Sequence, residues 1–216
     1  MNHVLTFRQR FVKRTFDLIL STVLLTLFGW MILLAWLAAS IDTGSNGMFQ
    51  QIRIGRWGRP FTIYKIKTMR PIKGFTTTVT AAHDRRITSL GKWLRRLKID
   101  ELPQLLNVLI GDMSFVGPRP DVPGFADHLE GEDQIILSLR PGITGPATLA
   151  FRNEEELLAR VPDPETYNRN VIYPVKVAAN LCYLYNYRFS LDLACILETA
   201  LGRERAHGKG NPIPQD

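Results

Sequence analysis

Two adjacent acids, Asp100 and Glu101, are the residues whose types and spacing best suit catalysis. They lie between two segments with helical spacing, at the start of the second, where a helix N-terminus favours anions and keeps a carboxylate ionised. An ionised aspartate can attack phosphorus and form an acyl phosphate. A neighbouring glutamate can hold Mg²⁺, which prefers carboxylate and phosphate oxygens. Adjacent acids are also common helix caps, so the pair alone leaves both interpretations open.

Prolines hold two arginines in short rigid segments. Arg119 stands between two prolines in Gly-Pro-Arg-Pro, and Arg140 opens Arg-Pro-Gly-Ile-Thr-Gly. Because proline fixes its own φ angle, it removes conformational freedom around the arginine. A rigidly held guanidinium suits bidentate phosphate binding. A rigid turn that merely contains arginine is the alternative for each.

A basic strand is expected next to these motifs. Two short segments with β character, 49–54 and 61–67, flank a loop with glycine and proline, which predicts a hairpin. The alternation of side chains places Lys65 and Lys67 on one face of the second strand. That face could bind phosphate or could be a solvated basic surface.

One segment, residues 18–41, runs for 24 residues without a charge. As a helix it would be about 36 Å long, enough for a hydrocarbon layer of about 30 Å. Both flanks are basic, and basic flanks prefer the cytoplasm, so both ends favour the same side. A re-entrant helix satisfies both flanks, and Gly29 is a candidate break within it. A straight span stays open, because long downstream domains can override the charge rule.

Further helices are expected around the acids. Residues 87–97 form a basic amphipathic pattern that suits either a membrane surface or the surface of a soluble core. Residues 102–109 predict a helix with Pro103 in its first turn and Gly111 at its end. The segment 154–160 is also expected to be helical, and so is 175–201, with interruptions at Arg188 and Asp192. Residues 75–82 are expected to form a loop.

Composition narrows the partners. The formal net charge is +7 and the pI about 9.6, which implies an anionic partner. No nucleic-acid motif is present, and the aromatics do not alternate with basic residues as an RNA platform would, so nucleic acid is not expected. Cys182 and Cys195 predict two packed thiols in a reducing compartment.

The motifs, taken in order, resemble the bacterial sugar transferase family, the small monotopic phosphoglycosyl transferases. The similar stretches are FQQIRIGRWGRPFTIYKIKTM (49–69), DRRITSLGKWLRRLKIDELPQLLNVLIGDMSFVGPRP (84–120), RPGITGPA (140–147) and YNYRFSLDLACILETA (185–200). The second stretch is long and unusual, so the resemblance favours a nucleophile over a cap at Asp100. One departure is that Phe-Gly-Trp (28–30) stands where the family usually breaks its hydrophobic helix at Ser-Pro.

The resemblance implies transfer of sugar-1-phosphate from a UDP-sugar to polyprenyl phosphate through a covalent aspartyl intermediate, which would initiate surface glycan assembly. Asp100 would be the nucleophile, Glu101 the Mg²⁺ ligand and Arg119 a phosphate clamp. Substrate contacts are expected from the residues at the family's other polar positions and in the second proline-arginine segment: Lys65, Lys67, Asp84, Arg86 and Arg140. Downstream glycosyltransferases would be partners. The alternative is a non-catalytic membrane-anchored protein whose basic surface binds anionic lipid or a partner.

The expected fold class is α+β, with one small catalytic domain at the membrane interface. Residues 1–42 would form a basic segment and a re-entrant membrane helix. Residues 43–207 would form the catalytic domain, with a small β-hairpin and amphipathic interfacial helices, and 208–216 a flexible tail. The expected location is the cytoplasmic face of a bacterial inner membrane.

Overall fold

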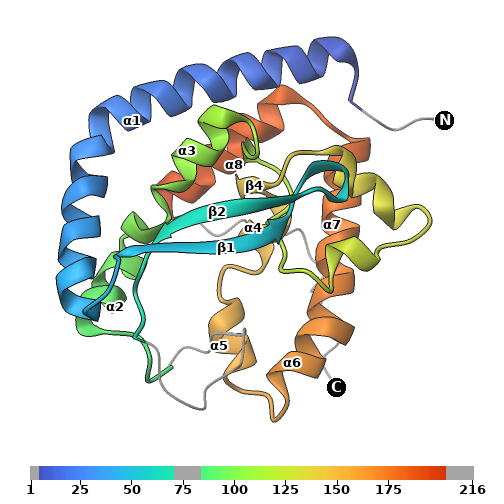
Figure 1. The fold of residues 1–216 in the computed structure, drawn as a ribbon. Helices are drawn as coiled ribbons and strands as arrows, with labels where there is room; N and C mark the ends of the chain where they lie inside the picture. Colours follow the sequence, from blue (N-terminus) through green and yellow to red (C-terminus); the bar gives the residue numbers. More distant parts are fainter. Residues whose placement is uncertain (1–4, 71–83, 203–216) are drawn as a thin grey trace.

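The computed structural model describes residues 5–70 and 84–202, which form a mostly helical body with two small sheets (Figure 1). The α+β class expected from the sequence is confirmed. The loop expected at 75–82 and the tail expected at 208–216 lie outside the described residues. The domain boundaries at 42 and 207 stay predictions.

Helix α1 (Phe7–Thr43) begins well before the uncharged segment and includes its basic flank. Its first turn is capped by Thr6, whose hydroxyl accepts a hydrogen bond from the Gln9 backbone at 3.3 Å, while the Gln9 side chain accepts one from the Thr6 backbone at 2.8 Å. Two of the N–H groups at the helix start are thereby satisfied. The helix ends at Gly44, which has a φ of +62°, a left-handed conformation that glycine adopts without strain.

Helix α1 bends partway along, so that its two limbs follow two sides of the body (Figure 1). The first limb packs side chains up to Leu25 on the main core, and the second packs side chains from Met31 onward on a second cluster. The helix therefore passes from the main core to the second cluster in the stretch that contains Gly29.

The helix continues through Gly29 without an interruption, and the bend falls in the stretch that contains this candidate residue (Figure 1). Glycine keeps its backbone N–H, unlike the proline of the family pattern, and the hydrogen-bond ladder continues through it. The hydroxyls of Thr22 and Thr26 donate to the carbonyls of Leu18 and Thr22 at 2.8 and 2.9 Å. Such bonds back to the preceding turn often bend a helix without breaking it.

The predicted hairpin is confirmed by the antiparallel strands β1 (Met48–Ile54) and β2 (Pro60–Ile66), in which Phe49 lies opposite Lys65. The two helical segments expected around the acids are also present, as α2 (Ser89–Arg96) and α3 (Gln104–Ile110). Pro103 precedes α3, and Gly111 ends it with a φ of +102°.

A second, parallel pair of short strands, β3 (Ser114–Val116) and β4 (Gly142–Thr144), brings the two proline-arginine segments side by side. The approach requires glycine, because a Cβ atom on Gly117 would lie 2.3 Å from the carbonyl oxygen of Arg140. Helices complete the chain: α4 (Pro146–Ala150), α5 (Glu154–Leu158), α6 (Pro164–Tyr167), α7 (Tyr173–Tyr185) and α8 (Phe189–Leu201). The helical stretch expected at 175–201, with interruptions at Arg188 and Asp192, is two helices separated at residues 186–188, while Asp192 lies within α8.

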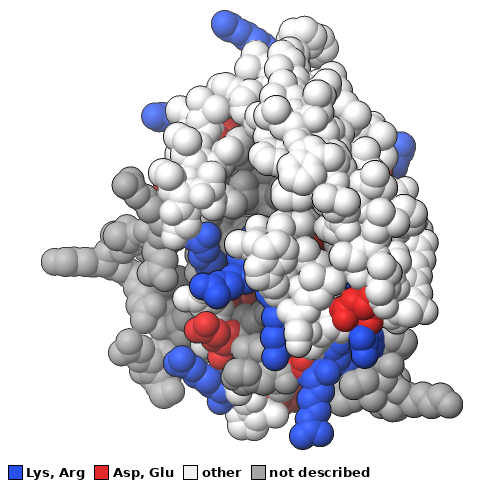
Figure 2. Space-filling model, turned by 90° about the vertical axis from the view of Figure 1, so that its left-hand side faces the viewer, with Lys and Arg blue, Asp and Glu red and all other residues white. Residues whose placement is uncertain are grey.

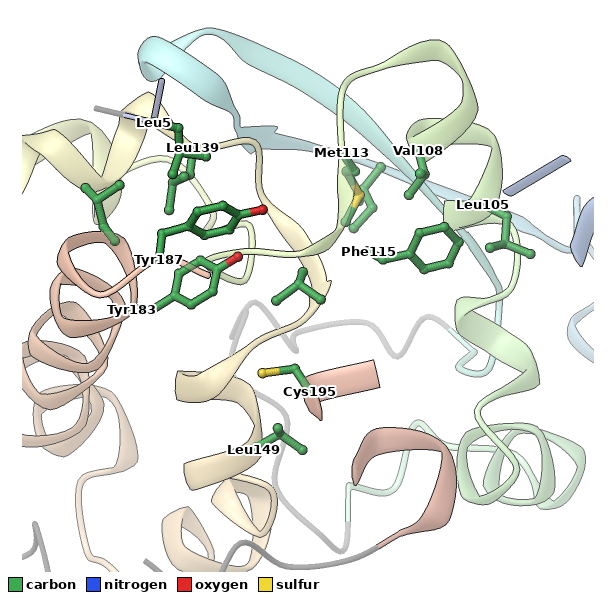
Figure 3. Packing of buried hydrophobic residues seen from close by; sticks show 13 residues of the cluster. Leu5, Leu105, Val108, Met113, Phe115, Leu139, Leu149, Tyr183, Tyr187 and Cys195 are labelled. Atoms are coloured by element: carbon green, nitrogen blue, oxygen red, sulfur yellow. The ribbon is translucent and has the colours of Figure 1, made fainter. Parts of the chain in front are cut away.

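The main core lies between α3, β3, α7 and α8, where Phe115, Leu105 and Tyr183 are among the buried side chains (Figure 3). Cys195 is buried in this core, as expected. Cys182 is exposed, so the expectation that both thiols are packed is wrong for this residue. It lies on α7 outside the face that buries Val177, Asn180, Tyr183 and Leu184.

Candidate active site

Asp100 and Glu101 lie in a short 3-10 turn, Ile99–Glu101, that joins α2 to α3. The chain enters this turn through Lys98, whose φ of +57° reverses its direction after α2. The acids therefore lie just before α3 rather than in its first turn. Asp100 is 7% exposed, which is uncommon for a carboxylate that serves only as a surface cap.

Glu101 is held by two cations from distant parts of the chain. Its Oε1 atom accepts hydrogen bonds from Lys65 Nζ at 2.9 Å and from Arg119 at 2.7 Å. Burial alone would raise the pKa of Glu101, but the charges of Arg119 and Lys65 outweigh it and hold the pKa well below its usual range. Glu101 is therefore ionised at neutral pH.

Asp100 has the opposite balance. Burial, helped by the negative charge of Glu101, raises the pKa of Asp100 to about 6, and Lys65 opposes this rise. Its Oδ1 atom is buried without a hydrogen-bond partner. An ionised carboxylate without a donor on one oxygen is poorly solvated, which suits a nucleophile.

These four side chains line a cavity of about 900 Å³. Leu24 and Phe28 of α1 contribute to the same lining, as do the apolar side chains of Leu105 and Phe115. The cavity thus combines a charged region around Asp100 with an apolar wall along the long helix. It can hold an anionic group next to an apolar chain.

The structure brings together only part of the set predicted from the sequence. Lys65, Asp100, Glu101 and Arg119 meet in the cavity. Lys67 follows β2 and donates to Ser45 at 2.9 Å, outside the cavity lining.

Asp84 and Arg86 pair with each other, at 2.6 Å, and neither lines the cavity. Arg140 donates to the carbonyl of Gly111 at 2.8 Å and lines a separate, smaller pocket. The substrate-binding roles of Lys67, Asp84, Arg86 and Arg140 stay predictions.

Arg53 and Asp121 are among the charged residues of the cavity that escaped the sequence reasoning. Arg53 of β1 donates to the carbonyl of Pro120 at 3.2 Å, and the backbone of Ile54 donates to the carbonyl of Asp121 at 2.9 Å. Burial raises the pKa of Asp121 to about 6, while Lys176 and Arg53 lower it. The position of Asp121, directly after Gly-Pro-Arg-Pro, was the available signal in the sequence.

Comparison with known proteins agrees with this arrangement. A sequence model described as "Bacterial sugar transferase" matches residues 8–203. The chain belongs to the bacterial sugar transferase family. This match covers α1, the cavity and both proline-arginine segments.

Curated relatives of this sugar transferase include enzymes and uncharacterised members. A UDP-glucose:undecaprenyl-phosphate glucose-1-phosphate transferase of Caulobacter vibrioides is 34% identical, over 87% of this chain and 67% of its own length. The uncharacterised sugar transferase EpsL of Bacillus subtilis is also 34% identical, over 87% and 85%. The undecaprenyl-phosphate galactose phosphotransferase of Salmonella typhimurium is 30% identical, over 89% of this chain but only 40% of its own length.

The sugar transferase presents an apolar face along α1. Among the described residues, α1 is the one helix long and apolar enough to cross a membrane, and only 17% of its apolar window is buried inside the protein. Figure 2 shows uncharged side chains over most of the upper part of this face and charged side chains gathered below. Trp93 and Leu97 at α2 are also exposed. This surface suits a membrane, not the core of a soluble protein.

Asp100 and Glu101 can supply two carboxylates for Mg²⁺, which is fewer ligands than a site built from protein side chains alone would need. The described residues contain no group of three metal-ligating side chains. Mg²⁺, however, is usually held by one or two carboxylates together with substrate phosphates. The unpartnered Oδ1 of Asp100, next to the ionised Glu101, is compatible with that mode.

Proposed function

We propose that this sugar transferase moves sugar-1-phosphate from a UDP-sugar to polyprenyl phosphate, releasing UMP and forming a polyprenyl diphosphate-sugar. The observation that carries the proposal is the contact of Glu101 with both Lys65 and Arg119 beside the buried Asp100, in a cavity walled by α1. The curated relatives carry the names of such transferases. A non-catalytic lipid-binding anchor has no need for a buried acid among cations.

The first step is attack by an ionised Asp100 oxygen on the phosphorus that bears the sugar. The bond between the two phosphates breaks, and the bridging oxygen leaves with UMP. The sugar phosphate remains on Asp100 as an acyl phosphate. Arg119 and Lys65 stand beside the acids and stabilise the negative charge that develops on the phosphate oxygens.

The second step is attack by an oxygen of polyprenyl phosphate on the same phosphorus, which returns Asp100 to a carboxylate. Two steps reduce repulsion, because the two anionic substrates never occupy the cavity together with full charge. Leu24 and Phe28 give the polyprenyl chain an apolar wall next to Asp100.

Mg²⁺ is the cofactor of this proposal. When bound, it neutralises charge on the diphosphate of the donor. Glu101, which is ionised, would hold it.

The proposed location is the cytoplasmic face of a bacterial inner membrane. Support comes from the basic flanks of the apolar segment and from the packing of both α1 limbs against one body, which suits a re-entrant helix. Membrane lipid is then a direct partner. Downstream glycosyltransferases would use the lipid-linked product.

The test is UMP release with a panel of UDP-sugars. Without polyprenyl phosphate, the protein with Mg²⁺ should release about one UMP per active site and gain the mass of one sugar phosphate on the Asp100 peptide. Asp100→Asn should do neither, because an amide cannot attack. Glu101→Gln should weaken the dependence on Mg²⁺ and keep the nucleophile. UMP that appears only with the lipid acceptor would indicate direct transfer and exclude the covalent intermediate.

A further inference from the structure

The cavity contains buried polar atoms that contacts within the protein do not satisfy. Besides Asp100, four of its lining residues have such a side-chain atom without a partner in hydrogen-bond geometry: Arg53 Nε, Thr148 Oγ1, Asn180 Oδ1 and Tyr173 OH, the last of which lies near the Asp121 carboxylate. Leaving one buried polar atom unpaired costs about 1–3 kcal/mol. Their concentration in a single cavity indicates a polar ligand that pairs with them.

Three of these residues lie on two helices that pack against each other, α4 and α7. Tyr173 and Asn180 stand seven positions apart on α7, with Lys176 between them, so all three share one face of the helix. Asn180 is only 5% exposed and lines the cavity. Thr148 joins them from α4.

The lysine on this face is already neutralised. Lys176 Nζ lies 2.7 and 2.6 Å from the two carboxylate oxygens of Glu154. Thr148 of α4 and the three residues on this face of α7 form one side of the cavity, which we call the α4–α7 wall. This wall therefore presents mainly hydroxyl and amide groups to a ligand, without net positive charge. Such a wall does not favour a phosphate.

A chain of neighbours connects this wall with the reaction centre. The charges of Arg119, Asp121 and Glu101 all act on the pKa of Arg53, so Arg53 lies near these three residues. Asp121 in turn acts on Tyr173 and Lys176. A ligand whose phosphate lies at Asp100 can therefore extend towards the α4–α7 wall within one cavity.

We propose that Thr148, Tyr173 and Asn180 bind the hydroxyl groups of the transferred sugar and select among UDP-sugars. Hydroxyl groups donate and accept, which matches two protein hydroxyls and one amide oxygen. The diphosphate has Lys65 and Arg119, and the polyprenyl chain has the apolar wall. Of the two remaining parts of the substrates, the transferred sugar and the uridine, the sugar is the richer in hydroxyl groups, which is why we assign the wall to it. The inference rests on the proposed function, because it assumes a UDP-sugar donor.

The test replaces one side chain at a time with an apolar one of similar shape, with Thr148→Val, Tyr173→Phe and Asn180→Leu. Each should lower kcat/KM for the preferred UDP-sugar by about 10- to 100-fold, the range for a lost hydrogen bond to a substrate hydroxyl. The ratio of kcat/KM for that sugar over its C4 epimer should change in at least one variant. The Kd of UDP, which lacks the transferred sugar, should change less than about twofold.

Ser138→Ala is the matched control. Ser138 is also buried with an unpartnered hydroxyl, but it lies outside the large cavity. This variant should keep the kcat/KM and the sugar preference of the wild type. Thermal unfolding of all four variants, as full chains in lipid nanodiscs, checks that they fold.

Two results would overturn the subsite. Equal losses of affinity for UDP and for UDP-sugar would place the nucleoside at this wall, and unchanged kinetics in all three folded variants would leave the wall without a substrate role. Calorimetric Kd values for UDP-sugar and UDP test this inference independently of the proposed function, because they measure binding and not UMP release. If the wild type binds UDP-sugar more tightly than UDP but releases no UMP, the transferase proposal fails, and loss of that preference in the variants still supports the subsite.

Discussion

Lys13 and Asp192 form a buried ion pair that fastens the first limb of α1 to α8. The Lys13 Nζ atom lies 2.6 Å from Asp192 Oδ2, and both side chains are less than a tenth exposed. The hydroxyls of Tyr183 and Tyr187 also donate to the Asp192 carboxylate, at 2.5 and 3.1 Å. Figure 3 shows these two hydroxyls pointing to the same side of the core. The pair thus fixes the helix that walls the cavity.

Lys13→Met should destabilise the protein by about 3–5 kcal/mol, because it leaves Asp192 charged and buried without its cation. Thermal unfolding in nanodiscs measures the loss. Adding Asp192→Asn should recover part of the stability by removing the stranded charge. Arg8→Met, on the exposed side of α1, is the control and should change stability by less than about 0.5 kcal/mol. A tolerated Lys13→Met would show that the pair does not fasten the helix.

Arg119→Lys should lower kcat/KM by about 10- to 100-fold while the melting temperature holds. Lysine keeps the positive charge beside Glu101 but loses the planar fork, so about 1.5–3 kcal/mol of charge-assisted hydrogen bonding to phosphate is lost. Steady-state UMP release measures the effect.

Arg140→Lys gives the contrasting case for Arg119→Lys. Arg140 donates to the Gly111 carbonyl and does not line the cavity, so its replacement should reduce stability more than kcat/KM. A sharp loss of activity in Arg140→Lys without loss of stability would restore the phosphate-binding role expected from the sequence. Full activity of Arg119→Lys would exclude a bidentate role there.

The two ends of α1 should face the same side of the membrane. Cys182 is exposed on the body and serves as a native reporter, and Thr6→Cys reports on the start of the helix. An impermeant maleimide should label neither position in intact spheroplasts and both after permeabilisation. A Cys182→Ser background isolates the Thr6 signal. Labelling at position 6 alone in intact spheroplasts would establish a true span.

Gly29→Ala should preserve activity within about twofold and should not lower the melting temperature. A Cβ atom at this position meets nothing within 4 Å, and alanine favours a helix by about 0.5–1 kcal/mol over glycine. Thr22→Val combined with Thr26→Val removes the hydroxyls that bond back to the preceding turns, and this double variant should reduce activity more. A severe loss in Gly29→Ala alone would make the glycine the origin of the bend.

Local signals in the sequence were sufficient for the elements around the acids. The hairpin, α2 and α3 follow from alternation, helical spacing and the Pro103 and Gly111 boundaries, which act within a few residues. The motif around Asp100 and the motif around Arg119 likewise named residues that meet in the cavity. Asp121 escaped because its one signal, a position directly after Gly-Pro-Arg-Pro, does not show that its side chain lies in the cavity.

The sequence by itself determined the candidate acids and cations of the cavity, the apolar helix and the α+β class, because residue type, motif and short-range periodicity encode them. Only the tertiary structure decided which cations reach Glu101. Lys65 and Lys67 share a strand face in the alternating pattern, yet Lys65 contacts Glu101 and Lys67 contacts Ser45, since β2 ends between them. The contacts of Lys13 with Asp192, and of α7 with the cavity, likewise depend on long-range packing, which no local spacing records.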